Sequence, residues 1–129
     1  MVDKDWIRKE VAAMLAAGGP AARICEIEKA LGHHVLPVGV TIPFAFDAKD
    51  WEPDSVVSLD GRRVRIVLIT ARTPGTGAFS RLVQNILRAG FKPVVVAPVG
   101  PEMPAILKHW GWRKAIERSG FEQSEEWTP

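Results

Sequence analysis

The chain has 129 residues, of which 47% are hydrophobic and 25% are charged, and its 17 basic and 15 acidic residues leave a formal net charge of +2. This length and composition predict one folded domain over 1–129 and exclude a chain that is disordered by composition. With a single cysteine, Cys25, the chain cannot form an internal disulfide or a cysteine-rich zinc module, and we expect Cys25 to be buried. No apolar run reaches the roughly 18 residues of a membrane span.

Three of the first ten residues are acidic, a pattern that argues against a signal peptide, so we expect a cytoplasmic protein with no membrane partner. Apolar residues at helical spacing predict helices over 5–17 and 21–31, separated by Gly18-Gly19-Pro20. The segments that follow are predicted to be extended over 35–40 and 41–46 and to form a polar loop over 47–54.

The middle of the chain carries the clearest local signals. Val56–Leu59 and Arg62–Thr70 are two extended runs joined by Asp60-Gly61, a pair that suits the two central positions of a type I′ turn. A glycine-rich turn over 72–77 then leads into a helix that ends at Gly90, and this helix is followed by a buried strand over 92–98. Because strand, helix and strand follow one another here, we expect the strands 62–70 and 92–98 to be parallel neighbours.

The C-terminal part is less regular. One helix is predicted to begin between Pro101 and Pro104 and to end near Trp110. Residues 111–129 are poorly patterned, and the acidic residues within 122–129 suggest a disordered, solvated tail. Taken together, these elements predict a single α/β (α+β) domain in which helices flank a mixed central sheet.

The turn Arg72-Thr73-Pro74-Gly75-Thr76-Gly77 is a candidate phosphate-binding site. Its glycines allow positive φ, and the helix that follows offers unpaired N–H groups and a partial positive charge at its N-terminus. The surrounding stretch 61–101 contains seven basic and no acidic residues. A P-loop is excluded because Ala78-Phe79 stands where Lys-Ser/Thr is needed, and a dinucleotide fingerprint is excluded because Ser80 replaces its third glycine.

A third phosphate-binding pattern, Arg/Gln-x-x-Gly-x-Gly/Ala, fits the turn completely. On this motif the chain resembles the GNAT acyltransferases, in which a strand, this turn and a helix hold the pyrophosphate of acyl-CoA. The order of elements is similar over 56–112 and less so over 1–55, and Trp110-Gly111-Trp112 resembles the step that closes the last helix of that family. The resemblance implies a GNAT-like fold with a final hairpin, which the sequence after 112 does not reveal.

The resemblance also implies a site for acetyl-CoA or another acyl-CoA as co-substrate. The main-chain N–H groups around Gly75, Thr76, Gly77 and Ala78 would hold the pyrophosphate, with Arg72 beside it. The backbone from Val67 to Ile69 would pair with the pantetheine arm inside a splayed gap between the two parallel strands. A cofactor with several negative charges would account for the acid-free stretch.

Residues that often complete the chemistry in this family are replaced here. Leu107 stands at the position of the Tyr that protonates the leaving thiolate, and Gly100 at that of an Asn. Glu102 and His109 are the remaining catalytic candidates, and the polar residues of the acceptor half are His33, His34, Asp47 and Asp50. For the two adjacent histidines, a helix C-terminus that favours partial positive charge explains the pattern better than a metal pair, so no metal site is predicted.

The predicted function is therefore acyl-CoA-dependent N-acyl transfer, with acetyl transfer favoured, to an amine that the sequence does not identify. The alternatives are a catalytically inactive GNAT-fold protein that binds or regulates, and a nucleic-acid-directed modifying or binding protein. Arg62, Arg63 and Arg65 fit either a solvated strand edge or contacts to the CoA 3′-phosphate or a nucleic acid. Trp110 and Trp112 fit core or acceptor-pocket walls better than a base-stacking platform.

Overall fold

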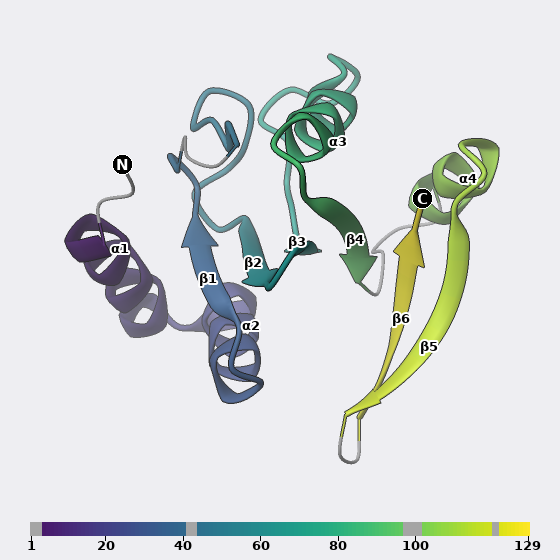
Figure 1. The fold of residues 1–129 in the computed structure, drawn as a ribbon. Coiled ribbons are helices and arrows are strands. Elements are labelled where there is room, and N and C mark those ends of the chain that lie inside the picture. Colours follow the sequence, from purple (N-terminus) through teal and green to yellow (C-terminus); the bar gives the residue numbers. More distant parts are fainter. Residues whose placement is uncertain (1–3, 41–43, 97–101, 120–121) are drawn as a thin grey trace.

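The computed structural model describes residues 4–40, 44–96, 102–119 and 122–129. In this part of the chain, four helices accompany a six-stranded sheet with the strand order β1-β2-β3-β4-β6-β5 (Figure 1). The elements are α1 (Lys4–Ala17), α2 (Gly19–Ala30), β1 (His34–Pro37), β2 (Val56–Asp60), β3 (Arg63–Leu68), α3 (Ala78–Arg88), β4 (Lys92–Val96), α4 (Glu102–His109), β5 (Arg113–Ser119) and β6 (Glu122–Thr128). The sheet is mixed, because β3 and β4 are parallel while the other neighbouring pairs are antiparallel.

Helices cover both faces of this sheet, and α2 and α3 lie on opposite sides of it (Figure 1). Leu82 and Ile86 of α3 pack with Val64 of β3 in the larger hydrophobic cluster. On the other face, Cys25 of α2 and Val35 of β1 belong to a smaller cluster that also includes residues of α1. The parallel pairing of β3 with β4, joined by α3, confirms the predicted strand–helix–strand unit. No helix in the described part of the chain is long and apolar enough to cross a membrane.

The hairpin between β2 and β3 turns one residue later than the sequence predicts. Asp60 pairs with Arg63, so the two central turn residues are Gly61 and Arg62 rather than Asp60 and Gly61. Gly61 has a φ of 59°, the positive value that the first central position of a type I′ or II′ turn requires. Because Gly61 provides the positive φ at the start of the turn, Asp60 does not need a turn conformation and remains paired in β2.

Strand β3 contains an irregularity next to its C-terminal end. Val56 pairs with Leu68 but Val57 pairs with Ile66, so Val67 is an extra residue without a partner on β2. The parallel pairing of β3 with β4 also stops at Ile66, opposite Val95. A bulge of this kind bends a strand and ends regular pairing, and bulges are frequent beside functional sites.

The segment predicted to be extended over 35–46 is a strand only in its first part. After Pro37 the chain closes a loop in which the Gly39 N–H donates to the Phe46 carbonyl and the Phe46 N–H donates to the Val40 carbonyl, both at 2.8 Å. Phe44 and Phe46 are nevertheless buried in the larger cluster. These two apolar side chains, which suggested a strand, pack this loop against the core instead. Residues 41–43 lie outside the described part of the chain.

The C-terminal segment is a hairpin and not a disordered tail, which corrects the prediction for 122–129. Strand β6 pairs with β4 through Val95–Trp127 and Val96–Glu126, and β5 then pairs with β6 along its length. Trp127 and Glu126 are both 3% exposed. The sequence did not predict this strand because one of its buried side chains, Glu126, is a carboxylate. A carboxylate is expected in solvent unless it has an ionic partner, and the partners of Glu126 lie on β3.

Candidate cofactor site

The glycine-rich turn leads directly into α3 and leaves the first turn of that helix open. Gly77 is the N-cap of α3 with a φ of 78°, and no side chain caps this end. Gly75 has a φ of 85°, and a Cβ there would meet nothing within 4 Å. The two glycines are thus required by backbone conformation rather than by crowding, and the first N–H groups of α3 keep their capacity to bind an anion.

Arg72 holds a neighbouring loop instead of standing free beside the turn. Its Nε donates to the carbonyls of Ala48 and Trp51, and its guanidinium lies 3.7 Å from the Glu52 carboxylate. Its N–H also donates to the Asp50 carbonyl at 2.9 Å. The structure therefore uses Arg72 to fasten the loop that contains these residues, and a role as a phosphate ligand would compete with these bonds.

Arg81 and Asp50 form a second contact at the turn that sequence reasoning missed. Arg81 Nη1 donates to the Thr76 carbonyl at 2.7 Å, and Nη2 donates to Asp50 Oδ1 at 3.0 Å. The spacing offered a signal, because Arg81 lies one helical turn after Gly77 and so faces back toward the loop. The fold thereby brings a carboxylate near a turn that has no acidic neighbour in sequence.

The end of β3 has no register partner on β4, although Leu68 still pairs with Val56 on β2. Val67 occurs in neither of the two strand pairings of β3, and Leu68 is the last residue of the strand. The side chains from Val67 to Ile69 are half-buried. Because β3 and β4 stop pairing at Ile66, the segment from Val67 to Ile69 begins where the parallel pairing ends.

An aromatic group lies between the start of α3 and the end of α4. Phe79 stacks on Trp110 with ring centroids 5.4 Å apart and an interplanar angle of 7°, and Trp110 contacts Trp112 at 6.1 Å. Trp112 is 9% exposed and belongs to the core, whereas Trp110 is 38% exposed. Gly111 ends α4 with a φ of 78°, and N–H bonds from Gly111 to Lys108 and from Trp112 to Leu107 form a Schellman cap.

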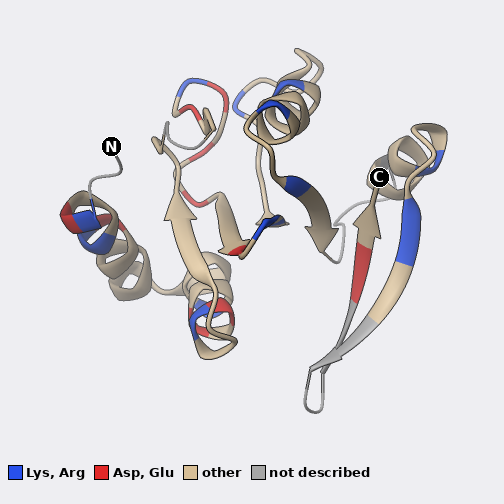
Figure 2. Cartoon of the chain, in the orientation of Figure 1, with Lys and Arg blue, Asp and Glu red and all other residues tan. Residues whose placement is uncertain are grey.

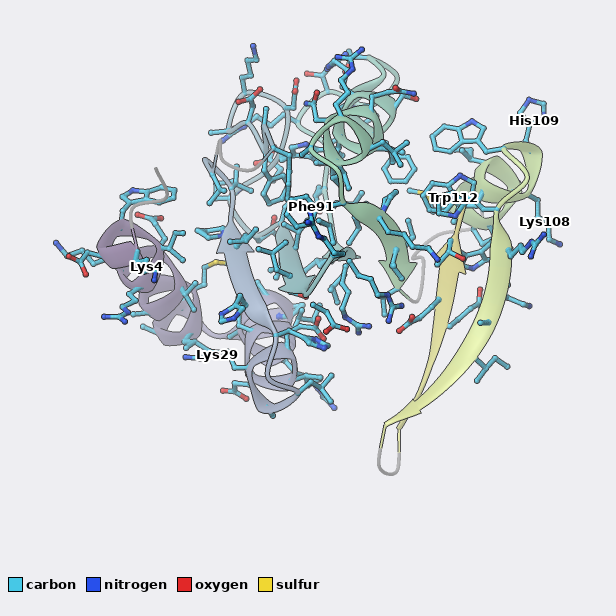
Figure 3. All side chains as sticks on the ribbon, viewed as in Figure 1. Lys4, Lys29, Phe91, Lys108, His109 and Trp112 are labelled. Carbon is cyan, nitrogen blue, oxygen red and sulfur yellow. The ribbon has the colours of Figure 1, made fainter. Side chains whose placement is uncertain are left out.

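None of the predicted catalytic candidates is shown at this site. Leu107 is fully buried in the core, and His109 is exposed and points away from the protein (Figure 3). Glu102 is the first residue of α4, but its side chain lies outside the described part, as does Gly100. The described residues also contain no group of three or more side chains that could hold a metal ion.

The arginines of β3 are held by carboxylates from distant parts of the chain. Arg65, which is 5% exposed, donates from Nε to Glu28 Oε1 at 2.8 Å and from Nη1 to Glu126 Oε2 at 2.7 Å. Arg63 also donates to Glu126, and the Ser58 hydroxyl donates to Glu28. Figure 2 shows the basic segment of β3 and the acidic segment of β6 on either side of β4. The interpretation of Arg65 as a solvated residue or an anion ligand is therefore wrong.

Charge and burial oppose each other in this network. Burial alone would raise the pKa of the Glu28 carboxyl, but hydrogen bonds from Arg65, Ser58 and His33 outweigh it and lower that pKa. Burial likewise favours the neutral form of Arg65, and the carboxylates of Glu28 and Glu126 overcome it and raise the pKa of the guanidinium. Burial also raises the pKa of the Cys25 thiol, as expected for an inert structural residue.

These pairs change the meaning of the acid-free stretch. Four of its seven bases, namely Arg63, Arg65, Arg72 and Arg81, make ion pairs with acids from other segments. Among the described residues, the other three make none; they are Arg62, Arg88 and Lys92. These three lie in the turn before β3, at the end of α3 and at the start of β4, which is the end of the parallel pair opposite to the glycine-rich turn.

No family model matches the chain, and no curated protein or solved structure matches it at a significant level.

Proposed function

We propose that the chain is a GNAT-like, acyl-CoA-dependent N-acyltransferase that acts in the cytoplasm and transfers an acetyl or other acyl group to an amine. The observation that carries the proposal is the junction of β3 with α3, where a positive-φ glycine turn, an uncapped helix N-terminus and strand backbone without a partner on β4 occur together. The N–H groups from Gly75 to Ala78 would bind the pyrophosphate. The backbone from Val67 to Ile69 would bind the pantetheine arm as an added strand.

The sheet order supports this proposal. The family resemblance implies a final hairpin, and β5 with β6 forms one beyond the closing Trp110-Gly111-Trp112 step. The same resemblance implies two adjacent parallel strands that part, and β3 and β4 stop pairing at Ile66. Transfer would rest on positioning of the thioester against a neutral amine and on stabilisation of the oxyanion. The C–N bond would form as the C–S bond breaks, and the amine proton would pass through solvent to the leaving CoA thiolate, without a dedicated general base.

The first experiment tests cofactor binding by thermal unfolding with and without acetyl-CoA. A ligand at 100 times its Kd adds about 2.7 kcal/mol to the free energy of unfolding. Ser80→Glu should abolish this gain, because it places a carboxylate in the open first turn of α3, while the helix itself tolerates an acid there. Gln84→Glu, an equal charge change one turn later on an exposed position, is the matched control and should keep the gain.

Absence of stabilisation at millimolar acetyl-CoA in the unmodified chain would refute the cofactor assignment. Equal loss in Ser80→Glu and Gln84→Glu would show that CoA does not bind at the start of α3. If CoA binds, release of free thiol in the presence of a panel of amines separates a transferase from a binding protein.

A catalytically inactive acyl-CoA-binding protein is the second candidate. It is favoured by Leu107, a buried apolar side chain at the position where the resemblance implies a Tyr as the acid, and by the outward direction of His109 (Figure 3). CoA binding without thiol release from any amine of the panel would favour this second candidate over the enzyme.

A further inference from the structure

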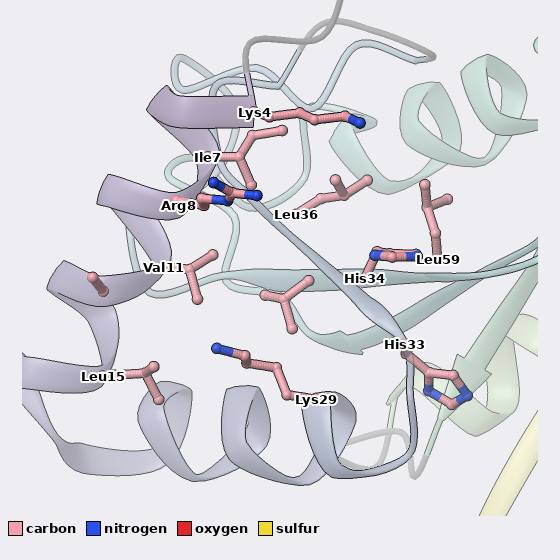
Figure 4. Close-up of a pocket in the computed structure, with 12 residues that line it drawn as sticks. Lys4, Ile7, Arg8, Val11, Leu15, Lys29, His33, His34, Leu36 and Leu59 are labelled. Carbon is pink, nitrogen blue, oxygen red and sulfur yellow. The ribbon is translucent and has the colours of Figure 1, made fainter.

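A second concave site lies at the other end of the sheet order, beside the edge strand β1. It is a pocket of about 720 Å³, open to solvent on one side, between α1, the C-terminal end of α2, β1 and β2 (Figure 4). Strands β1 and β2 separate it from β3, and it shares no lining residue with the glycine-rich turn. Its size falls in the range of small-molecule sites, about 300–1,000 Å³.

The wall of the pocket is aliphatic. Ile7, Val11 and Leu15 of α1 follow one another at helical spacing and face Leu36 of β1 and Leu59 of β2 across the pocket. Among the described residues no Phe or Trp lines it, and its planar side chains are the imidazoles of His33 and His34 at the rim. The wall is suited to a flexible hydrocarbon chain, for which burial contributes about 0.8 kcal/mol per CH₂ group.

The rim of the pocket is basic. Lys4, Arg8 and Lys29 line it together with His33 and His34, and no Asp or Glu of the described ranges does. The three cations are exposed and make no ion pair with another residue in the described part of the chain. In Figure 4 these cations come from two different helices, α1 and α2, on opposite sides of the aliphatic wall.

We propose that this pocket binds an amphipathic carboxylate, a single aliphatic chain with one anionic head of the medium-chain fatty acid type. The chain would lie along the α1 stripe and the head would meet Arg8 and Lys29 at the rim. Charge complementarity selects the occupant, because an uncharged lipid leaves the cations without a partner and a cationic amphiphile is repelled by them. The site is independent of the CoA site, so either proposal can fail while the other holds.

Isothermal titration calorimetry with decanoate below its micelle concentration tests the proposal. Decanoate should bind with one-to-one stoichiometry, and decyltrimethylammonium, which has the same chain with the opposite charge, should bind at least about tenfold more weakly. Equal binding of the two amphiphiles would overturn the charge argument. Absence of decanoate binding would overturn the proposal itself.

Variants locate the bound probe. Arg8→Glu should weaken decanoate binding about tenfold or more, whereas Lys9→Glu, the neighbouring exposed residue that does not line the pocket, should leave the affinity unchanged. Ala12→Phe, at an exposed lining position, should block the chain without disturbing a core side chain. An equal effect of Arg8→Glu and Lys9→Glu, or unchanged binding in Ala12→Phe, would place the decanoate elsewhere and refute the assignment.

Ser80→Glu separates this site from the cofactor site. Decanoate affinity should be the same in this variant as in the unmodified chain, because α3 does not line the pocket. A loss of decanoate binding in Ser80→Glu would mean that the probe occupies the turn region, and would refute a second site.

Discussion

At the scale of single residues, Gly39 fixes how the chain passes beside α1. It has a φ of 107°, and a Cβ at this position would lie 2.9 Å from Cη2 of Trp6. Gly39→Ala therefore combines backbone strain with a clash, and we expect it to lower the free energy of unfolding by about 2–4 kcal/mol. Urea denaturation followed by circular dichroism measures this change.

Gly32→Ala is the control for Gly39→Ala. Gly32 also has a positive φ, 82°, but a Cβ there would meet nothing within 4 Å, so this variant has the strain without the clash. Its cost should be about 1–2 kcal/mol. Equal costs in the two variants would show that Trp6 yields freely and that only the backbone conformation matters at Gly39.

At the scale of secondary-structure elements, the terminal hairpin depends on the inward side chain of β6. Trp127 is 3% exposed and packs in the larger cluster, while Ile116 on β5 is 64% exposed. We expect Trp127→Ala to lower the free energy of unfolding by about 3–5 kcal/mol and Ile116→Ala to change it by less than about 0.5 kcal/mol. Chemical denaturation of both variants tests this; similar values would mean that the hairpin adds little to the core.

The elements also show what sequence reasoning could reach. Apolar periodicity located α1, α2 and α3, and the run of strand, helix and strand predicted that β3 and β4 are parallel neighbours. The hairpin of β5 and β6 was missed, because the charge of the buried Glu126 is compensated by Arg63 and Arg65 on another strand. Long-range ion pairs leave no periodic signal in a single sequence.

Some features of the candidate site could likewise be predicted from the sequence, and others could not. The positive-φ glycines and the open start of α3 follow from local sequence, since Gly75 and Gly77 precede a periodic apolar run. The bulge at Val67 and the contact of Arg81 with Asp50 depend on the register and on a loop from another segment. Only the tertiary arrangement can therefore show how much positive charge remains available at the turn.

At the scale of the whole molecule, one buried network joins the first and last thirds of the chain. Glu28 on α2 and Glu126 on β6 both accept hydrogen bonds from Arg65, which lies on the central strand between them. Glu28→Gln removes one of the two carboxylates that hold Arg65, while Glu126 still accepts from its Nη1. Hydrogen bonds to charged groups contribute about 1.5–3 kcal/mol, so we expect Glu28→Gln to destabilise the protein by about this amount at pH 7. Glu26→Gln, an exposed neighbour on α2, should cost less than about 0.5 kcal/mol.

The same network predicts how stability depends on pH. The folded protein lowers the pKa of Glu28 below its ordinary value of 4.5, so the unfolded chain takes up this proton at a higher pH than the folded one does. The stabilisation from Glu28 is then fully present above pH 4.5 and is lost as the pH falls through the lower folded pKa. Arg65 stays charged over this range, because its pKa is raised from a value that is already basic. Free energies of unfolding measured between pH 7 and pH 3 should therefore converge for the unmodified chain and Glu28→Gln as the pH falls, and a difference that stays constant over this interval would show that Glu28 does not act through its charge.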